Sequence, residues 1–243
     1  MSQPRRFTAL ATDYDGTIAR HGEVSAATFR ALSRWKDAGR KLLLVTGREL
    51  PDLFKVCPFT AVFDRIVAEN GALLFNPSTK EQRVIAPEPP KDFVDFLRLK
   101  GVTPLSVGRT IVATNENFHG VVLEGIEKLG LKWKVVLNKG ALMVLPHNVD
   151  KTTGLIVALE ELQTSPADTI AVGDAENDHV FLAFCGYSAA VANALPFLKK
   201  QAHYVTRSSH GAGVEELIDR MLQDSAPDCG EHAVQQELLQ PER

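Results

Sequence analysis

The chain has 243 residues, of which 44% are hydrophobic and 23% charged, and its formal net charge is -3. This composition is typical of a globular protein with one large domain or two modest ones, and it argues against nucleic-acid binding through a broad basic face. No apolar run is long enough for a signal peptide or a membrane span, so we expect a cytoplasmic protein without membrane contacts. Three cysteines, Cys57, Cys185 and Cys229, form no CxxC pair and are expected to be reduced thiols.

Strand and helix patterns alternate in the first third of the chain. Uniformly apolar, β-prone runs predict strands at 7–12, 42–45 and 65–68. Ser25 is a candidate N-cap for a helix that continues to Ala38. Asn70 and Gly71 predict a hairpin turn that leads back into a strand at 72–75.

The pattern changes at Pro87, Pro89 and Pro90, which indicate a hinge. The residues that follow predict helices at 93–99 and 118–129 and strands at 109–113, 133–137 and 142–145. Asn138-Lys139-Gly140 is a tight hairpin signal between the last two strands. Residues 87–146, called the cap below, are therefore predicted to form a small α+β insert with an antiparallel sheet.

After the cap the α/β alternation resumes. It predicts a helix at 151–162, a strand at 169–172, a helix after Asn177, strands near Ala189 and Tyr204, and a helix at 214–221. We therefore expect an α/β fold with a Rossmann-like parallel sheet core, flanked by helices and built from residues 1–86 and 147–223. Residues 224–243 carry five acids against one arginine and predict an acidic flexible tail, or a linker to a further domain.

Ligands of open parallel sheets bind at the carboxyl ends of the strands, where four polar clusters are predicted to lie. The first is Asp13-Tyr14-Asp15-Gly16-Thr17. Residues two apart at the end of a strand point to the same side, so the carboxylates of Asp13 and Asp15 are expected to converge. Such a pair requires a cation between the acids or a proton on one of them. The alternative is a solvated turn, because Asp and Gly are ordinary turn residues.

The second and third clusters favour an anion site. Thr46-Gly47-Arg48 follows the second strand and is predicted to begin a helix, whose N–H groups would bind an anion. The alternative is a plain strand-to-helix turn. Lys151 is predicted in the first turn of a helix, where a cation is unfavourable unless an anion lies nearby. The alternatives are a lysine exposed to solvent or one paired with Asp150.

The fourth cluster favours a metal site. Residues 173–178, with the sequence GDAEND, gather three acids and an amide after the strand at 169–172. Oxygen-rich clusters of this kind suit Mg²⁺, which prefers octahedral oxygen ligands. The alternative is capping of the next helix by Asn177 or Asp178, although a cap needs only one of these residues.

In their order and placement, DYDGT, TGR, the lysine and GDAEND resemble the four motifs of the haloacid dehalogenase (HAD) superfamily. Residues 69–72 and 193–214 are further similar to its Cof-like branch of sugar-phosphate phosphatases, which place an α/β lid between the second and third motifs. The resemblance runs from about residue 7 to 222, except for the cap. Two features depart from that branch: Tyr14 stands where an aliphatic residue is usual, and the cap is short.

The resemblance implies the role of each motif residue. Asp13 would be the nucleophile that forms an aspartyl-phosphate, and Asp15 would be the general acid and later the base for water. Phosphoryl oxygens would be bound by the following residues: Gly16, Thr46, Gly47, Arg48 and Lys151, with Asn177 orienting Lys151 or the phosphate. Mg²⁺ would be held by Asp13, the carbonyl of Asp15, Asp174 and Asp178.

The predicted function is therefore a Mg²⁺-dependent phosphatase of a small phosphorylated metabolite, with a sugar phosphate as the favoured substrate. Each pair of like unit charges at ~4 Å costs about 4 kcal/mol at an effective dielectric near 20, so the attack of a carboxylate on phosphate needs Mg²⁺ and Lys151. The mildly basic cap offers Arg109, Lys139 and His147 as candidate contacts. The alternatives are a phosphomutase or other phosphotransferase, and a non-catalytic domain of a larger protein that senses a phospho-ligand.

Overall fold

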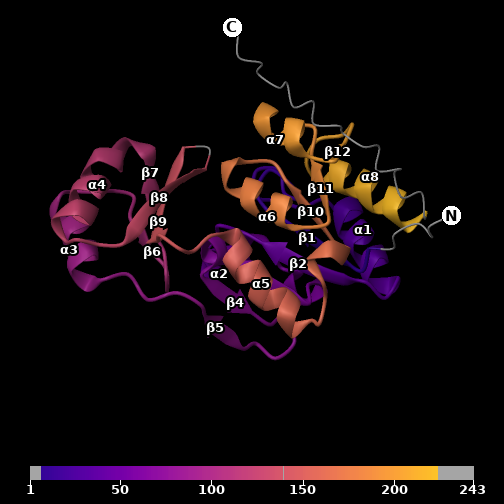
Figure 1. Cartoon of the computed structure of the whole chain (residues 1–243), viewed down its shortest axis with the longest axis horizontal. Helices are drawn as coiled ribbons and strands as arrows, with labels where there is room; N and C mark the ends of the chain where they lie inside the picture. The colour runs from indigo at the N-terminus through magenta and orange to yellow at the C-terminus, as the bar shows by residue number, and fades with distance from the viewer. Residues whose placement is uncertain (1–6, 139, 224–243) are drawn as a thin grey trace, which may run out of the picture.

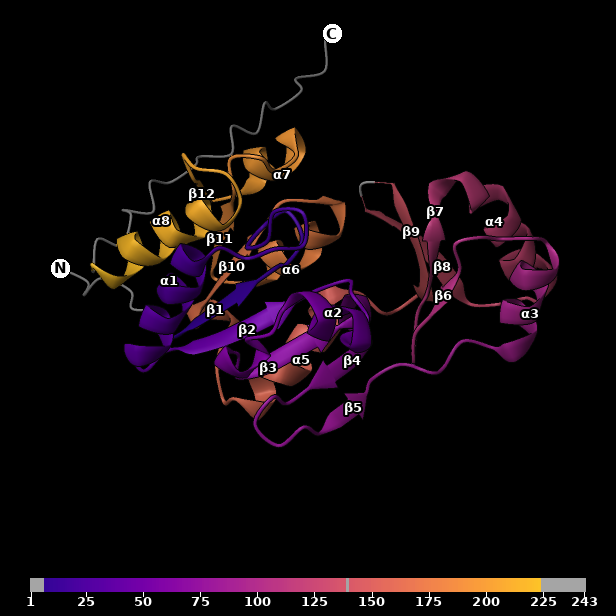
Figure 2. The same ribbon diagram turned by 180° about the vertical axis from the view of Figure 1, so that it is seen from behind.

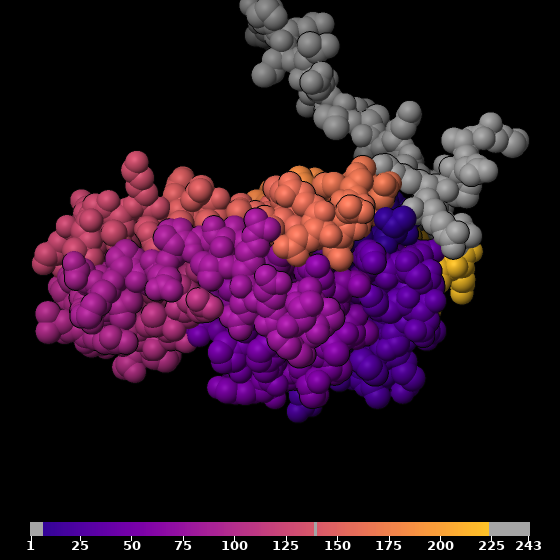
Figure 3. Space-filling model, turned by 90° about the horizontal axis from the view of Figure 1, so that it is seen from below, coloured from indigo at the N-terminus to yellow at the C-terminus, as the bar shows by residue number. Residues whose placement is uncertain are grey.

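The computed structural model describes residues 7–138 and 140–223, which form two units arranged along the long axis of the molecule (Figure 1). The larger unit, the core, comes from both ends of the described chain, and the cap lies at one end (Figure 2). On the face seen from below, the surfaces of the cap and the core meet (Figure 3). Lys139, Cys229 and the predicted tail at 224–243 lie outside the described residues. The prediction of an α/β fold is confirmed.

The core sheet has eight strands in the order β12-β11-β10-β1-β2-β3-β4-β5. Their bounds are β1 Ala9–Thr12, β2 Lys41–Val45, β3 Arg65–Ala68, β4 Leu73–Phe75, β5 Gln82–Val84, β10 Thr169–Gly173, β11 Tyr187–Ala190 and β12 Tyr204–Val205. The strands from β12 to β3 are parallel, while β4 and β5 extend the sheet as antiparallel neighbours. Thr12 lies in register with Leu44 and Val172, so the residues that follow β1, β2 and β10 meet at one edge.

Helices cover both faces of this sheet. Their bounds are α1 Ala26–Asp37, α2 Leu50–Val56, α5 Lys151–Glu161, α6 His179–Phe184, α7 Pro196–Gln201 and α8 His210–Leu222. Figures 1 and 2 show α5 and α6 on one face and α1, α2 and α8 on the other. Leu42, Leu43 and Leu44 of β2 are fully buried, which explains why this strand is uniformly apolar rather than alternating. None of the described helices combines the length and the apolar character that crossing a bilayer requires.

The cap has its own sheet and its own apolar cluster. Its elements are α3 Lys91–Leu99, β6 Ser106–Val107, β7 Val112–Asn115, α4 His119–Lys128, β8 Trp133–Asn138 and β9 Ala141–Pro146. The strands are antiparallel in the order β6-β7-β9-β8. Leu142 and Val144 on one face of β9 are buried against Phe93 and Val122 of the cap helices. Because strand residues alternate between faces, Ala141 and Met143 point the other way.

The sequence misplaced the start of a helix and a cap strand, and it missed one core strand. Residues 46–48 do not begin a helix, since α2 starts at Leu50 after the N-cap residue Glu49, and Pro51 fits only such a first turn. The strand predicted at 109–113 is instead β7, because the N–H of Gly108 donates to the carbonyl of Ile111 and closes a turn there. Strand β5 was missed because all three of its residues are exposed and show no burial pattern.

The predicted start of α1 is confirmed, and it also joins α1 to α8. The hydroxyl of Ser25 accepts a hydrogen bond from the N–H of Thr28 (3.0 Å) and lies 2.9 Å from the Thr28 hydroxyl. That hydroxyl in turn donates to Glu215 on α8 (2.7 Å). Ser25 therefore stabilises the N-terminal end of α1 and, through Thr28, the packing of α1 against α8.

We expect Ser25→Ala to lower the free energy of unfolding by about 1 kcal/mol, because the N-terminal N–H groups lose their acceptor. Ser33→Ala is a matched control on the same helix, since Ser33 only donates back to the carbonyl of Phe29. Its effect should stay within about 0.5 kcal/mol, because alanine has the higher helix propensity. Urea unfolding curves measure both changes, and equal losses in the two variants would show that the cap is unimportant.

Candidate active site

A cleft of about 500 Å³ lies between the carboxyl ends of the core strands and the cap. On the core side it is lined by Asp13, Asp15, Thr46, Gly47, Arg48, Glu49, Pro51, Asp52 and Lys55. On the cap side it is lined by Ser106, Ile111, Ala113, Asn138, Ala141 and Met143. Two of the four predicted clusters, at 13–17 and 46–48, therefore line one cavity. The other two, Lys151 and residues 173–178, lie behind them.

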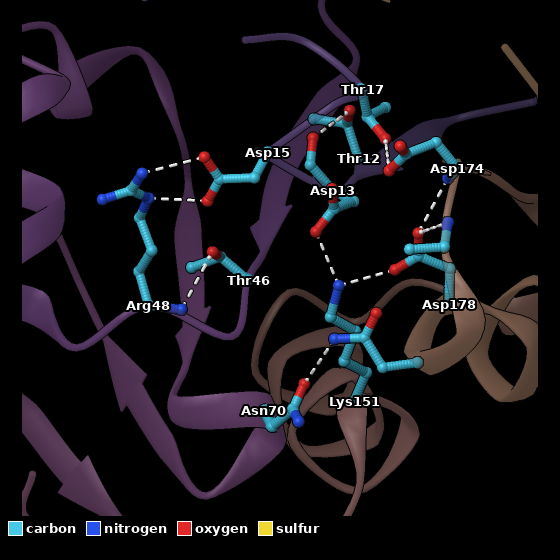
Figure 4. Close-up of polar contacts among 12 residues, drawn as sticks. Thr12, Asp13, Asp15, Thr17, Thr46, Arg48, Asn70, Lys151, Asp174 and Asp178 are labelled. Carbon is cyan, nitrogen blue, oxygen red and sulfur yellow. Dashed lines mark hydrogen bonds and ion pairs between the residues drawn. The ribbon is translucent and has the colours of Figure 1, made fainter. Parts of the chain in front are cut away.

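Lys151 lies between two aspartates at the base of this cleft (Figure 4). Its ammonium donates to Oδ1 of Asp13 and to Oδ1 of Asp178, both at 2.6 Å, and only 1% of its side chain is exposed. Burial alone would lower the pKa of Lys151, but the two carboxylates outweigh burial and raise it. Both alternatives for Lys151 are excluded: the side chain is buried rather than exposed, and Asp150 caps α5 through the N–H groups that follow it.

The surroundings of Asp13 disfavour the charged form of its carboxyl group. Burial raises the pKa of Asp13 well above its usual range, and the neighbouring acids Asp178 and Asp174 raise it further, against the lowering effect of Lys151. Burial is the main cause of the raised pKa of Asp13, whereas the raised pKa of Lys151 is due to the carboxylates of Asp13 and Asp178. An added positive charge would stabilise these carboxylates.

Asp174 is fully buried beside the loop that follows β1. Its Oδ1 accepts a hydrogen bond from the hydroxyl of Thr17 (3.1 Å), and Asn193 contacts its Oδ2 at 3.4 Å. A Cβ at Gly16 would lie 2.2 Å from Oδ2 of Asp174, and Gly16 has a φ of +86°. Only glycine therefore lets the two loops approach so closely. Asn193, which also donates to the carbonyl of Gly16 (2.8 Å), was not among the predicted site residues.

The residue types of this cluster fit a hard divalent cation. One oxygen each of Asp13, Asp174 and Asp178 lies within 4.8 Å of the others, and all three residues are buried. Three carboxylates face the single ammonium of Lys151, so negative charge is in excess, and carboxylate oxygens are the ligands that Mg²⁺ prefers. Asp178 differs from the other two acids, because its Oδ2 already accepts from the N–H groups of Asp174 (2.8 Å) and Ala175 (2.9 Å).

The carboxylate of Asp15 points away from this cluster and is paired with Arg48 (Figure 4). The guanidinium donates through Nε to Oδ2 (2.6 Å) and through a terminal nitrogen to Oδ1 (2.8 Å), and it also binds Asp52. The side chain of Asp15 is 40% exposed, against 7% for Asp13. The two acids line one cleft but face different cations, and a metal contact from Asp15 would have to use its backbone carbonyl.

Tyr14, between these two acids, points into the core and is fully buried. Its hydroxyl lies within hydrogen-bond distance of the carbonyls of Gly22 (2.9 Å) and Val56 (3.1 Å), and its ring lies 5.5 Å from the guanidinium carbon of Arg48. The ring thus supports the cation that holds Asp15.

Some of the predicted phosphate donors are already used within the protein. The N–H of Gly16 donates to the carbonyl of Ala19 (2.9 Å) in this conformation, and the binding of phosphate by backbone N–H groups near Asp15 and Gly16 stays a prediction. The N–H of Arg48 donates to the hydroxyl of Thr46 (3.1 Å), which leaves the proton of that hydroxyl for another acceptor. Gly47 lines the cleft, and Asn177 donates to Asn70 (2.9 Å) beside Lys151.

The cap residues that line the cleft are not those that the sequence suggested. Arg109 and His147 are exposed and do not line it, and Lys139 lies outside the described residues. The apolar wall comes instead from Ala113, Ala141 and Met143, with Ile111 beside them. The alternation along β9 was the available signal, because Leu142 and Val144 fill the cap's own cluster and leave Ala141 and Met143 for the core side.

Comparisons with known proteins show the family and the fold of the chain. A family model described as haloacid dehalogenase-like hydrolase matches residues 10–125 and 133–218. A phosphoglycolate phosphatase from Methanothermobacter thermautotrophicus is 30% identical over 223 residues, covering 88% of this chain and 98% of that protein. A HAD/Cof-like hydrolase from Plasmodium vivax superposes with a TM-score of 0.76 at 18% identity, covering 89% of this chain and 96% of the other. A HAD subclass IIB sugar phosphatase superposes with a TM-score of 0.72, also at 18% identity, covering 90% and 100%.

We expect Lys151→Met to lower the free energy of unfolding by about 3–5 kcal/mol near neutral pH, because two buried carboxylates lose their cation. Lys151 lowers the pKa of Asp13, so its loss raises that pKa further, and the folded variant binds this proton more tightly than the folded wild type does. The deficit should therefore grow as the pH rises from about 5 to about 8 and shrink as it falls.

Urea unfolding at both pH values measures this dependence, with the exposed Lys200→Met as the control. A loss that is the same at both pH values would contradict the assignment of excess buried negative charge to this cluster.

Proposed function

The chain belongs to the haloacid dehalogenase-like hydrolases, and on that premise we propose that it is a Mg²⁺-dependent phosphatase that forms an aspartyl-phosphate on Asp13. The family match confirms the resemblance that the four motifs indicate. The observation that carries the proposal is the buried cluster of Asp13, Lys151, Asp174 and Asp178 at the base of a cleft that Asp15 also lines.

In the proposed reaction, an oxygen of Asp13 attacks the phosphorus atom and the bond to the leaving alcohol oxygen breaks. Asp15 supplies the proton that the leaving oxygen needs and later takes one from the water that releases inorganic phosphate. Lys151 holds Asp13 in place and neutralises the phosphoryl oxygens. A bound Mg²⁺, held by Asp13, Asp174 and the carbonyl of Asp15 with Asp178 beside it, would supply positive charge for the same oxygens.

Asp15 can act as an acid only after Arg48 moves. A carboxylate that accepts two hydrogen bonds from a guanidinium has no proton to donate, and pairing with Asp15 raises the pKa of Arg48, which stays charged. An anionic substrate that enters the cleft competes for Arg48, since the guanidinium binds carboxylate and phosphate oxygens equally well in a bidentate manner. Substrate binding would thus release Asp15 next to the leaving group.

The cleft favours a short phosphorylated acid such as phosphoglycolate, the substrate named for the 30% identical relative. Arg48 and Lys55 are cations in the lining that could bind a carboxylate, whereas the cap wall is largely apolar and offers Ser106 and Asn138 as its polar groups. A sugar phosphate is the second candidate, because the volume of about 500 Å³ exceeds what a two-carbon acid needs.

Purified protein with Mg²⁺ should release inorganic phosphate from phosphoglycolate, from hexose phosphates or from p-nitrophenyl phosphate. Asp13→Asn should lower this rate at least ~1,000-fold without changing the circular dichroism spectrum, because the amide cannot take the phosphoryl group. Asp37→Asn, at the exposed end of α1, is the matched control. Near-normal turnover by Asp13→Asn would rule out the proposed nucleophile.

The same assay separates the alternatives. If phosphate appears on an added sugar or alcohol in place of water, the protein is a phosphotransferase. Binding without any turnover would indicate a phospho-ligand sensor.

Mg²⁺ at about 100 times its dissociation constant should stabilise the protein by about 2.7 kcal/mol. For a chain of this size, that corresponds to a rise in Tm of about 5–10 °C over protein in EDTA. Asp174→Asn should remove most of this rise, because the cluster loses a carboxylate. Asp219→Asn, which removes an exposed partner of Arg34, should keep it. A rise that is the same in both variants would place the ion elsewhere.

A further inference from the structure

The turn Glu69–Gly71 (η2), directly after β3, has an unusual backbone. Glu69, Asn70 and Gly71 have φ angles of +50°, +56° and +103°, and the first two are not glycines. Residues with a Cβ occupy this region at a cost in free energy, and they do so where the surrounding structure holds them. All three residues are buried, with Glu69 only 1% exposed.

The carboxylate of Glu69 extends from the core to the cap, where it binds the turn between β6 and β7. It accepts hydrogen bonds from the N–H of Arg109 (3.1 Å), the N–H of Thr110 (2.7 Å) and the hydroxyl of Thr110 (2.7 Å). A Cβ at Gly108 would lie 2.9 Å from this carboxylate, so the turn fits closely around it. All three donors are neutral cap groups, and a buried carboxylate without them would be strongly unfavourable.

The same turn is bonded to both loops of the active site. The N–H groups of Glu69 and Asn70 donate to the carbonyls of Arg48 and Thr46, each at 3.0 Å. The side-chain oxygen of Asn70 accepts from Asn177 at 2.9 Å (Figure 4). The cap is therefore connected through two adjacent residues to the loop after β2 and to the loop after β10.

One other cap–core contact is buried, that of the Asn70 amide nitrogen with the Met143 sulfur (3.5 Å), but sulfur is a weak acceptor. Two further polar contacts are less shielded from water. Ser106 donates to Glu49 at 2.5 Å and Arg109 donates to Gln82 at 3.4 Å, but both contacts are exposed. Exposed contacts exchange readily with water, whereas the donors of a buried carboxylate must stay in place. Among the described residues, Glu69 thus makes the most demanding polar contact across this boundary.

We propose that Glu69 is a positioning residue that holds the cap over the cleft. Through its own hydrogen bonds, Asn70 couples this position of the cap to the loops at 46–48 and 174–178. This inference rests on the proposed phosphatase function for its kinetic readout. With Glu69 bound to Thr110, the cap strands carry Ile111, Ala113 and Met143 to the substrate side of the cleft. Without that bond, the cap wall would no longer have a fixed distance from Asp13.

The experiment compares Glu69→Gln and Thr110→Val with the wild type in the full chain. Hydrogen exchange of the peptide that spans 106–112 should become at least 10-fold faster in Glu69→Gln, because the N–H groups of Arg109 and Thr110 lose their charged acceptor. Exchange in β1 and β2 should stay unchanged. The KM for phosphoglycolate should rise at least 5-fold in Glu69→Gln, with a smaller change in kcat.

Thr110→Val removes one donor only and should have a smaller effect on both measurements. In the double variant its additional effect should be smaller than its effect alone, because the shared bond is already lost. Glu88→Gln, an exposed carboxylate of the hinge, is the matched control and should behave as the wild type.

Wild-type exchange at 106–112 together with a wild-type KM in Glu69→Gln would overturn the proposal, and so would full additivity of the two substitutions. If Glu69→Gln does not fold, Thr110→Val alone must still speed exchange and raise KM for the proposal to stand. A wild-type protein that hydrolyses no phosphate ester would reject the phosphatase function, but the exchange result would still decide the role of Glu69.

Discussion

The site depends on an excess of buried negative charge at the carboxyl ends of neighbouring parallel strands. Asp13 follows β1 and Asp174 follows β10, and the register of these strands brings both to the same edge as Thr46 after β2. The ammonium of Lys151 offsets part of that charge from the first turn of α5. Such a cluster is stable only with protons or further positive charge. The preference for protons or for added positive charge thus follows from the sheet topology, and positive charge is also what a phosphoryl group requires.

The core and the central charged residues could be predicted because their signals are local. Asp13 and Asp174 each lie next to a short apolar run that predicts a strand, and ligands bind at the ends of parallel strands. Lys151 was placed by the resemblance, because its position in the first turn of a helix, where a cation is mildly unfavourable, is only a weak signal by itself. The N-cap Ser25 and the hairpin at Asn70-Gly71 likewise depend on residues close in sequence.

The remaining features depend on contacts between distant residues, which leave no periodic signal. Arg48 was expected to bind an anion at a helix start, yet its partner is Asp15, 33 residues earlier. Glu69 accepts a hydrogen bond from Thr110, which lies 41 residues later in the sequence, and neither residue type indicates the other as its partner. The exposed strand β5 has no buried face, so it has no pattern to detect. In the cap, charge suggested Arg109, but the alternation of β9 decides which side chains face the cleft.

Three consecutive residues after β1 place two acids against different cations. In Asp13-Tyr14-Asp15 the tyrosine points into the core, where its hydroxyl contacts Gly22 and Val56 and its ring lies against Arg48. That support holds the guanidinium at Asp15, while Lys151 holds Asp13. Asp13 is therefore buried and restrained, as suits the proposed nucleophile, whereas Asp15 is more exposed. Tyr14, where the resemblance leads us to expect an aliphatic residue, fits the core because its hydroxyl lies within hydrogen-bond distance of two backbone carbonyls.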